Sequence, residues 1–407
     1  MSRRALIGQL VLIVLVAVNL RPAIVAVGPV LTEISDEFRL SGTAAGALTT
    51  LPLVFFGAYG LLAAFLRRAP RNESLLIAAM VLLMAGLVLR LAGAPVALFA
   101  GSLVAGIAIS IGNIVMPAII KRDHPDSITT VTAVYTVALT GGAAVSQGLV
   151  VPVEHALDSS WRVPLGLLVI PAGLAAVVWL PRARRAADAP SVGSSSRALA
   201  AHVWRSPLAW QVTVFMGVQS LLAYVVVGWL PTICQDRGMA EASAGYVLAL
   251  SSLMQAVGSL CVPLLERRMR DQRPLVGALV VASLIGFTGI AWAPIGSVWL
   301  FSAVLGLGQG LGFATALSFI GLRAQDARVA AQLSGMAQGV GYMIAAMGPL
   351  AIGALHDATH GWTVPIVVTL VVVAGLTIPG LAAGRNRAVT VPVEPTPTAK
   401  RAPSRSK

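Results

Sequence analysis

Long apolar segments recur along the whole of this 407-residue chain. A helix needs about 20 predominantly apolar residues to cross the hydrocarbon core of a bilayer. Charged residues make up only 11% of the chain, whereas soluble domains contain about 25%. The sequence therefore predicts an all-α integral membrane protein with twelve transmembrane helices. The expected spans are 6–30, 44–66, 74–92, 96–120, 127–151, 163–180, 207–231, 243–265, 274–293, 297–320, 329–353 and 363–383.

The basic residues are distributed unevenly between the loops that these spans would place on the two sides of a membrane. Of the 29 Lys and Arg residues, 24 fall on the side of the two termini, three on the other side, and two inside spans. Cytosolic loops carry such an excess of basic residues. We therefore expect a multi-pass inner-membrane protein with both termini in the cytosol. The net charge of +13 is then a consequence of topology, and no nucleic-acid partner is expected.

The chain resembles itself at an offset of about 200 residues. Matching pairs include Gly28 and Gly228, Asp36 and Asp236, Gly106 and Gly306, Gly112 and Gly312, and Asp126 and Asp326. The repeat predicts two pseudo-symmetric six-helix bundles, residues 1–181 and 207–384. A cytosolic linker, 182–206, would join them, and a disordered cytosolic tail, 385–407, would follow. Transporters built from two such parallel halves bind their solute between the halves, near the membrane midplane.

Arg21 lies inside the first apolar segment, beside Asn19. A guanidinium at membrane depth costs at least about 2.5 kcal/mol, so such residues face a protein interior or a water-filled cavity. We expect Arg21 to bind an anion or a strongly polar solute, although a side chain that reaches the outer surface is the alternative. Arg90 lies nearer the outer end of its span and is expected to extend toward that surface.

Amide side chains fall only on the spans that would surround a central cavity. They are Asn19, Asn113, Gln147, Gln219, Gln255, Gln309 and Gln338, on spans 1, 4, 5, 7, 8, 10 and 11. Tyr135 and Tyr342 lie well inside their spans, and Tyr224 and Trp229 could help to close a small pocket. The alternatives are hydrogen bonds between helices for the amides and anchoring at the membrane interface for the tyrosines. The expected substrate-binding residues are Arg21, Asn19, Asn113, Tyr135, Gln219, Gln255, Gln309, Gln338 and Tyr342.

Carboxylates are missing from the cores of all the expected spans. The buried acidic relay of many proton-coupled carriers is therefore not expected, and exchange or uniport is favoured. Glu33, at the outer end of the first span, is the candidate coupling residue if protons are used. No P-loop, catalytic triad or metal-ligand cluster is evident, and Cys234 and Cys261 lack metal-site spacing. The sequence thus predicts no enzyme, no metal site and no cofactor.

Several stretches together resemble the cyanate/nitroimidazole permease family of the major facilitator superfamily. They are Asn19-Leu20-Arg21-Pro22-Ala23-Ile24, Gly112-Asn113-Ile114-Val115-Met116-Pro117-Ala118-Ile119-Ile120-Lys121-Arg122, Trp229-Leu230-Pro231, Gln255-Ala256-Val257-Gly258-Ser259 and Gln338-Gly339-Val340-Gly341-Tyr342. The resemblance covers all twelve spans. It implies the major facilitator fold and movement of a small solute, with cyanate uptake and nitroimidazole export as precedents.

Two functions remain open at this point. The first is a secondary transporter that moves a small anionic or polar, cyanate-like solute across the inner membrane by alternating access. The second is an exporter of small neutral aromatic compounds such as nitroimidazoles, in which Arg21 is structural. In both cases the expected partners are a small-molecule substrate and the lipid bilayer, and the protein is expected to act as a monomer.

Overall fold

The computed structural model describes residues 3–40, 44, 48, 54–58, 71–187, 197–266 and 268–390. In the described part, eleven helical segments are long and apolar enough to cross a membrane. Most of the expected second span, 44–66, lies outside the described residues. Because lipid offers no hydrogen-bond partners, the backbone of each apolar segment satisfies its polar groups internally by forming a helix. The expected all-helical membrane fold is confirmed.

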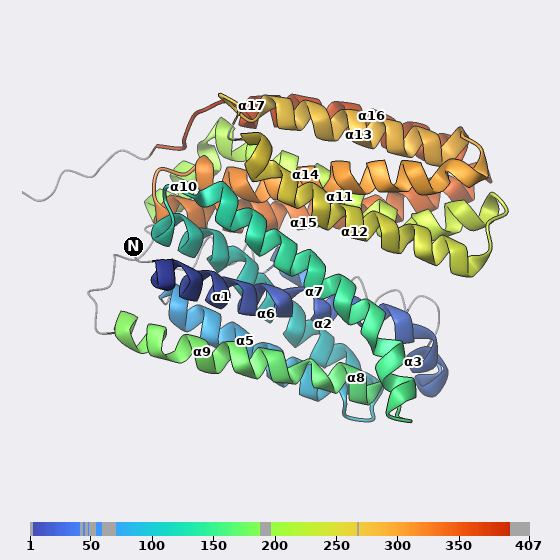
Figure 1. Cartoon of the computed structure of the whole chain (residues 1–407), viewed down its shortest axis with the longest axis horizontal. Helices are drawn as coiled ribbons and strands as arrows, with labels where there is room; N and C mark the ends of the chain where they lie inside the picture. The colour runs from blue at the N-terminus through green and yellow to red at the C-terminus, as the bar shows by residue number, and fades with distance from the viewer. Residues whose placement is uncertain are drawn as a thin grey trace, which may run out of the picture.

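The helices form two groups that lie side by side in Figure 1. The first group holds α1 (Arg3–Leu20), α2 (Pro22–Val25), η1 (Gly28–Val30), α3 (Leu31–Phe38), α5 (Asn72–Arg90), α6 (Pro95–Asp123), α7 (Ile128–Ala156), α8 (Arg162–Leu167) and α9 (Val169–Ala187). The second group holds α11 (Pro207–Asp236), α12 (Glu241–Glu266), α13 (Arg273–Trp292), η2 (Ile295–Ser297), α14 (Val298–Leu322), α15 (Ala327–Thr359), α16 (Thr363–Gly375) and α17 (Thr377–Ala383). We call these groups the N-terminal and C-terminal halves.

One helix at the centre of each half is buried nearly all round. The most apolar windows of α6 and α14 are 83% and 78% buried, whereas that of α9 is 28% buried. The halves meet where α6 and α7 contact α12, α14 and α15. Residues from α6 and α14 can therefore face the interface between the halves.

Glycines in α14 allow the close packing of this central helix. A Cβ at Gly310 would lie 2.0 Å from the Gln255 carbonyl oxygen, and one at Gly306 would lie 2.2 Å from the Ser251 carbonyl oxygen. Both carbonyls belong to α12, so only residues without a side chain fit at these two positions. The glycine run thus serves helix packing, as its spacing in a membrane span indicates.

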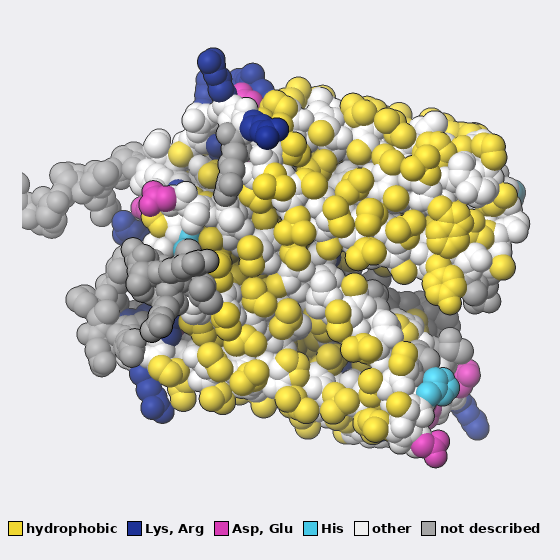
Figure 2. All heavy atoms as spheres, in the orientation of Figure 1, with side chains coloured by type: hydrophobic (Ala, Val, Ile, Leu, Met, Phe, Trp, Pro, Cys, Tyr) yellow, Lys and Arg dark blue, Asp and Glu magenta, His cyan; other side chains and the backbone are white. Residues whose placement is uncertain are grey.

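The two ends of the molecule differ in charge. The end that carries Arg122, Arg182 and Arg323 is called the basic end, and Lys and Arg side chains gather there in Figure 2. At the basic end Gly321 of α14 packs on Ile128 of α7, because a Cβ at Gly321 would come within 2.7 Å of the Ile128 side chain. At the opposite end Figure 2 shows a recess between the halves.

The structure describes parts of the segments between and after the halves. The expected linker, 182–206, contains the end of α9 and a further helix, α10 (Arg197–Arg205), which packs on α15 and α11. Residues 385–390 of the expected tail are also described, and the Val389 N–H donates to the Arg323 carbonyl at 2.7 Å. Val389 is also buried, and this apolar contact explains why the segment stays on the basic end. Residues 391–407 lie outside the described part.

Candidate substrate-binding site

A small cavity lies between the two halves, at the depth of Arg21. It is lined by Leu20, Arg21, Ile24, Phe56, Ile109, Asn113, Leu139, Tyr224, Phe313 and Tyr342. Its volume is about 20 Å³, which is little more than one water molecule requires. The structure therefore represents a state in which the side chains close around the site.

Arg21 enters this cavity because the first span is broken there. The α1 helix ends at Leu20 and α2 begins at Pro22, whose ring has no N–H to continue the hydrogen-bond ladder. The Arg21 carbonyl accepts bonds from the N–H groups of Ile24 and Val25, at 3.0 and 3.2 Å. The break places the Arg21 side chain at the junction of two helical segments instead of on a continuous helix face.

The Arg21 guanidinium crosses to the other half of the protein. Its central carbon lies 4.7 Å from the centre of the Phe313 ring on α14. Such a stack is worth about 0.5–2 kcal/mol, depending on how far it is desolvated. Within the described residues, no carboxylate and no hydrogen-bond acceptor pairs with this guanidinium, so its donors remain free for a ligand.

Asn113 connects three helices beside Arg21. Its amide nitrogen donates to the Ile109 carbonyl at 3.0 Å, and its side-chain oxygen accepts from the Tyr135 hydroxyl at 2.7 Å. The Gln338 amide donates to the Asn113 backbone carbonyl at 2.8 Å and to the Ser334 hydroxyl at 2.8 Å. The side-chain groups of Asn113 are therefore largely satisfied by protein.

Aromatic rings form part of the cavity wall. The Tyr342 ring centre lies 4.1 Å from that of Phe56 and 6.4 Å from that of Tyr224. In the described part of the chain, neither tyrosine hydroxyl forms a hydrogen bond with protein. These two hydroxyls and Arg21 are thus polar groups of the cavity lining that have no hydrogen-bond partner among the described residues.

The nine substrate-binding residues predicted from the sequence fall into three groups. Arg21, Asn113 and Tyr342 line the cavity. Tyr135 and Gln338 reach it only through their hydrogen bonds to Asn113. The remaining four are not among the residues that line it: Asn19, Gln219, Gln255 and Gln309.

Three of these four amides form hydrogen bonds with other parts of the protein, and the fourth lies where two helices pack closely. Asn19 donates to the Pro171 carbonyl of α9 at 3.1 Å, and Gln309 donates to the Leu222 carbonyl of α11 at 3.4 Å. The Gln219 amide stays within α11, where it donates to the Ser220 hydroxyl at 2.7 Å. Gln255 is half-buried, and its backbone carbonyl packs on Gly310. Of the two further candidates for closing the pocket, Tyr224 lines the cavity, whereas Trp229 donates to the Pro349 carbonyl away from it.

Phe56 and Phe313 line the cavity but carry no polar group, so they are not among the substrate-binding residues predicted from the sequence. The internal repeat contains a signal for one of them: Phe313 is 200 positions after Asn113, at the equivalent place on the equivalent helix. An aromatic residue at that position is therefore a candidate for the cavity whatever its polarity.

Glu33, the candidate coupling residue, lies on α3 at the opposite end and is exposed. Partial burial raises the pKa of its carboxyl above the ordinary value, and so does a hydrogen bond with the Glu154 carboxyl of α7. A raised pKa favours the protonated form of the Glu33 carboxyl, but Glu33 is not among the residues that line the cavity.

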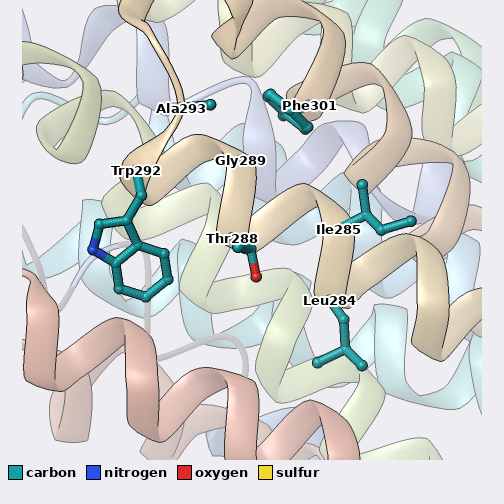
Figure 3. Close-up of a pocket in the computed structure, with 7 residues that line it drawn as sticks. All are labelled: Leu284, Ile285, Thr288, Gly289, Trp292, Ala293 and Phe301. Atoms are coloured by element: carbon teal, nitrogen blue, oxygen red, sulfur yellow. The ribbon is translucent and has the colours of Figure 1, made fainter.

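A larger hollow, of about 420 Å³, lies on the outside of the C-terminal half (Figure 3). It is formed by α13 and the start of α14, and it is lined by Leu284, Ile285, Thr288, Gly289, Trp292, Ala293 and Phe301. The lining carries no charge, and Ile285 and Trp292 are about half exposed. This surface suits lipid chains and not a polar solute.

Comparison with known proteins agrees with the fold. The family model described as Major Facilitator Superfamily matches residues 12–349. The 2-nitroimidazole transporter of Escherichia coli (strain K12) is 38% identical over 379 residues, which cover 93% of this chain and 95% of that protein. The uncharacterized transporter YycB of Bacillus subtilis (strain 168) is 36% identical, over 92% and 93% of the two chains. The cyanate transport protein CynX of Escherichia coli (strain K12) is 29% identical, over 91% and 95%.

Solved structures show the same architecture. The transporter FucP in its outward conformation superposes with a TM-score of 0.74 at 12% identity, over 93% of this chain and 99% of that one. The xylose symporter XylE gives a TM-score of 0.71. The chain is a transporter of the major facilitator superfamily.

Proposed function

We propose that this protein is a secondary transporter of a small anionic solute, which it moves across the inner membrane by alternating access. The observation that carries the proposal is the Arg21 guanidinium, which faces the cavity between the halves without a protein counter-charge in the described structure. A desolvated cation is costly at this depth, and a bound anion would offset that cost. The name of the relative CynX supports a solute of the cyanate type.

Each lining group has a role in this proposal. Arg21 holds the negative group with two parallel N–H donors, and the hydroxyls of Tyr224 and Tyr342 supply further hydrogen bonds that replace lost water. Asn113 fixes the positions of Tyr135 and Gln338 around the site. Rocking of one half against the other would then expose Arg21 to each side of the membrane in turn.

Substitution of Arg21 tests the proposal. Arg21→Gln is expected to abolish cyanate-driven stabilisation and transport while the protein still folds. Arg21→Lys should restore only part of the binding, because an ammonium lacks the planar fork of the guanidinium. Asn19→Ala is the matched control, since the Asn19 amide binds α9, and it should leave binding nearly unchanged. Normal cyanate binding by folded Arg21→Gln would refute the proposal.

A second function is favoured by the aromatic wall and by the relative named 2-nitroimidazole transporter. Phe56, Tyr224, Phe313 and Tyr342 could stack a small neutral aromatic compound for export, with Arg21 as a donor to a nitro group. The two functions separate in a stability-shift screen of the purified protein, because a ligand that binds only the folded state raises its apparent stability. A shift with small anions that disappears in Arg21→Gln supports the first, and a shift with nitroaromatics that survives it supports the second.

The membrane orientation is part of the same proposal and has its own test. Cysteines are introduced at Arg184, exposed at the basic end, and at Ser160, exposed at the opposite end. A membrane-impermeant thiol reagent added to intact cells is expected to label Ser160→Cys and not Arg184→Cys, because basic loops stay in the cytosol. Labelling of Arg184→Cys alone would reverse the orientation.

A further inference from the structure

A second arginine, Arg90, is buried in the N-terminal half. It is the last residue of α5, and its place in the sequence predicts a side chain that extends toward the nearby membrane surface. The structure contradicts this expectation, because Arg90 is only 2% exposed. No Asp or Glu lies in the cores of the expected spans to neutralise it. A charge buried at such cost needs a specific partner.

The partner of Arg90 is the backbone carbonyl of Ala23, which accepts a hydrogen bond from the Arg90 Nη1. Ala23 belongs to α2, the four-residue helix that follows the break at Arg21. The Ala26 N–H bonds to the Pro22 carbonyl, and the next N–H bond of the ladder is from Val30 to Val27. The Ala23 carbonyl is therefore a helix-end acceptor that the backbone leaves open, and a cation is the favourable cap for it.

Close packing of α5 on α6 fixes the direction of the Arg90 side chain. A Cβ at Gly101 of α6 would lie 2.5 Å from the Gly86 carbonyl oxygen, 2.7 Å from the Arg90 backbone nitrogen and 2.8 Å from the Arg90 Cγ. Only a glycine fits at position 101, so the stem of Arg90 is held against a bare helix backbone. The guanidinium can then reach α2 and stay there.

We propose that Arg90 is a positioning residue for Arg21. Its hydrogen bond to Ala23 holds α2 at a fixed angle after the break, two residues from Arg21. That angle sets where the Arg21 guanidinium enters the cavity. The proposal rests on the proposed function for its effect on transport, whereas its effect on the position of residue 21 is independent of the substrate.

The C-terminal half offers a matched control. Arg237, which follows α11, donates through its two terminal nitrogens to the carbonyls of Ile290 and Ala293 at the end of α13. Arg237 thus caps a helix end with the same chemistry, and the residue it supports is not one that lines the cavity. Loss of either arginine should weaken packing, but only the loss of Arg90 should move residue 21.

The experiment measures residue 21 directly. Arg21→Cys is prepared with Cys234→Ala and Cys261→Ala, and its rate of reaction with a small anionic methanethiosulfonate is determined in proteoliposomes. Adding Arg90→Met is expected to change this rate by about tenfold, as a residue leaves a fixed position. Arg237→Met should leave the rate within about twofold, and Arg90→Lys should give an intermediate rate, because it keeps a charged donor.

Transport provides the second readout. With Arg21 intact, Arg90→Met should raise the KM for cyanate about tenfold with little change in the maximal rate, and Arg90→Lys should recover part of the affinity. If Arg90→Met does not yield folded protein, the labelling rate of Arg21→Cys is compared with and without Arg90→Lys. An unchanged rate in Arg90→Lys then overturns the proposal. A changed labelling rate together with normal cyanate transport by Arg21→Gln would refute the proposed function and leave the positioning role intact.

Discussion

The side-chain amide of Gln338 donates a hydrogen bond of 2.8 Å to the backbone carbonyl of Asn113. Gln338 belongs to α15 of the C-terminal half and Asn113 to α6 of the N-terminal half, so this bond joins the two moving parts of the transporter beside its cavity. The acceptor is a backbone group of a residue whose own side chain holds Tyr135. Closure of the halves and the arrangement of the site are therefore linked at one residue.

Replacement of Gln338 by leucine is expected to favour opening of the basic end. The bond is specific to the closed arrangement and is worth about 1 kcal/mol, which corresponds to about a fivefold change in population. Spin labels at Arg184 and Arg270, exposed in the two halves at that end, would report the change as a longer distance. The matched control is Gln219→Leu, whose amide bonds only within α11. An unaltered distance distribution in Gln338→Leu would show that the bond does not bias the halves.

Phe313→Leu is expected to weaken anion binding by about twofold to about thirtyfold. Leucine keeps the apolar contact but removes the ring face over which the Arg21 guanidinium lies, a contact of about 0.5–2 kcal/mol. The dissociation constant for cyanate measured by calorimetry checks this. Phe301→Leu makes the same change on the same helix at the outer hollow, and it should have no effect. Tighter binding in Phe313→Leu would mean that the ring competes with the anion for Arg21.

The fold follows from the sequence because membrane helices are encoded by length and apolarity, both of which are visible without contacts. The position of Arg21 also follows, since a buried charge beside a proline leaves few alternatives. The roles of the amides do not follow. Asn19 and Asn113 are the same residue type at similar depth, yet one bonds to α9 and the other lines the cavity. Which face of a helix an amide occupies depends on helix rotation, which is set by packing.

Packing also determines where the Arg90 side chain and Val389 lie. Arg90 is buried because Gly86 and Gly101 let α5 and α6 pack closely. The Ala23 carbonyl then lies within hydrogen-bond reach of the Arg90 guanidinium. Without this contact the Arg90 side chain would extend to the surface. Val389 is held by a parallel β-bridge to Ala324 and by burial of its side chain at the basic end, and neither is predictable from a polar, proline-containing stretch.

Glu33→Gln is expected to change how stability depends on pH. The folded-state pKa of Glu33 is raised by burial and by Glu154, so the stabilisation it contributes is present below its ordinary pKa of 4.5 and is lost as the pH rises through the folded-state value. The variant should therefore gain stability relative to the native protein as the pH rises above 4.5. Thermal unfolding in detergent at a series of pH values measures this difference.

Glu37→Gln is a control in which the stability difference from the native protein should change with pH in the opposite direction. Hydrogen bonds from Arg162 and from the Trp161 indole lower the pKa of Glu37, so its contribution is present above the ordinary pKa and is lost as the pH falls. This variant should lose stability relative to the native protein as the pH rises from below toward the ordinary pKa of 4.5, and the difference should stay constant above it. Parallel curves for Glu33→Gln and the native protein would mean that folding does not raise the pKa of Glu33.

Transport itself is expected to proceed without an imposed pH gradient. The cavity contains one arginine and two tyrosine hydroxyls but no carboxylate or histidine among its lining residues, so the substrate step includes no group that titrates near neutral pH. Proteoliposomes loaded with unlabelled cyanate should therefore take up labelled cyanate by counterflow at equal pH. Glu33→Gln should retain this exchange, because Glu33 does not line the cavity. If counterflow is absent and a pH gradient alone drives accumulation, the coupling proton binds elsewhere. Loss of that accumulation in Glu33→Gln would then assign the proton to the Glu33 and Glu154 pair, which lies at the end of the protein opposite its basic face.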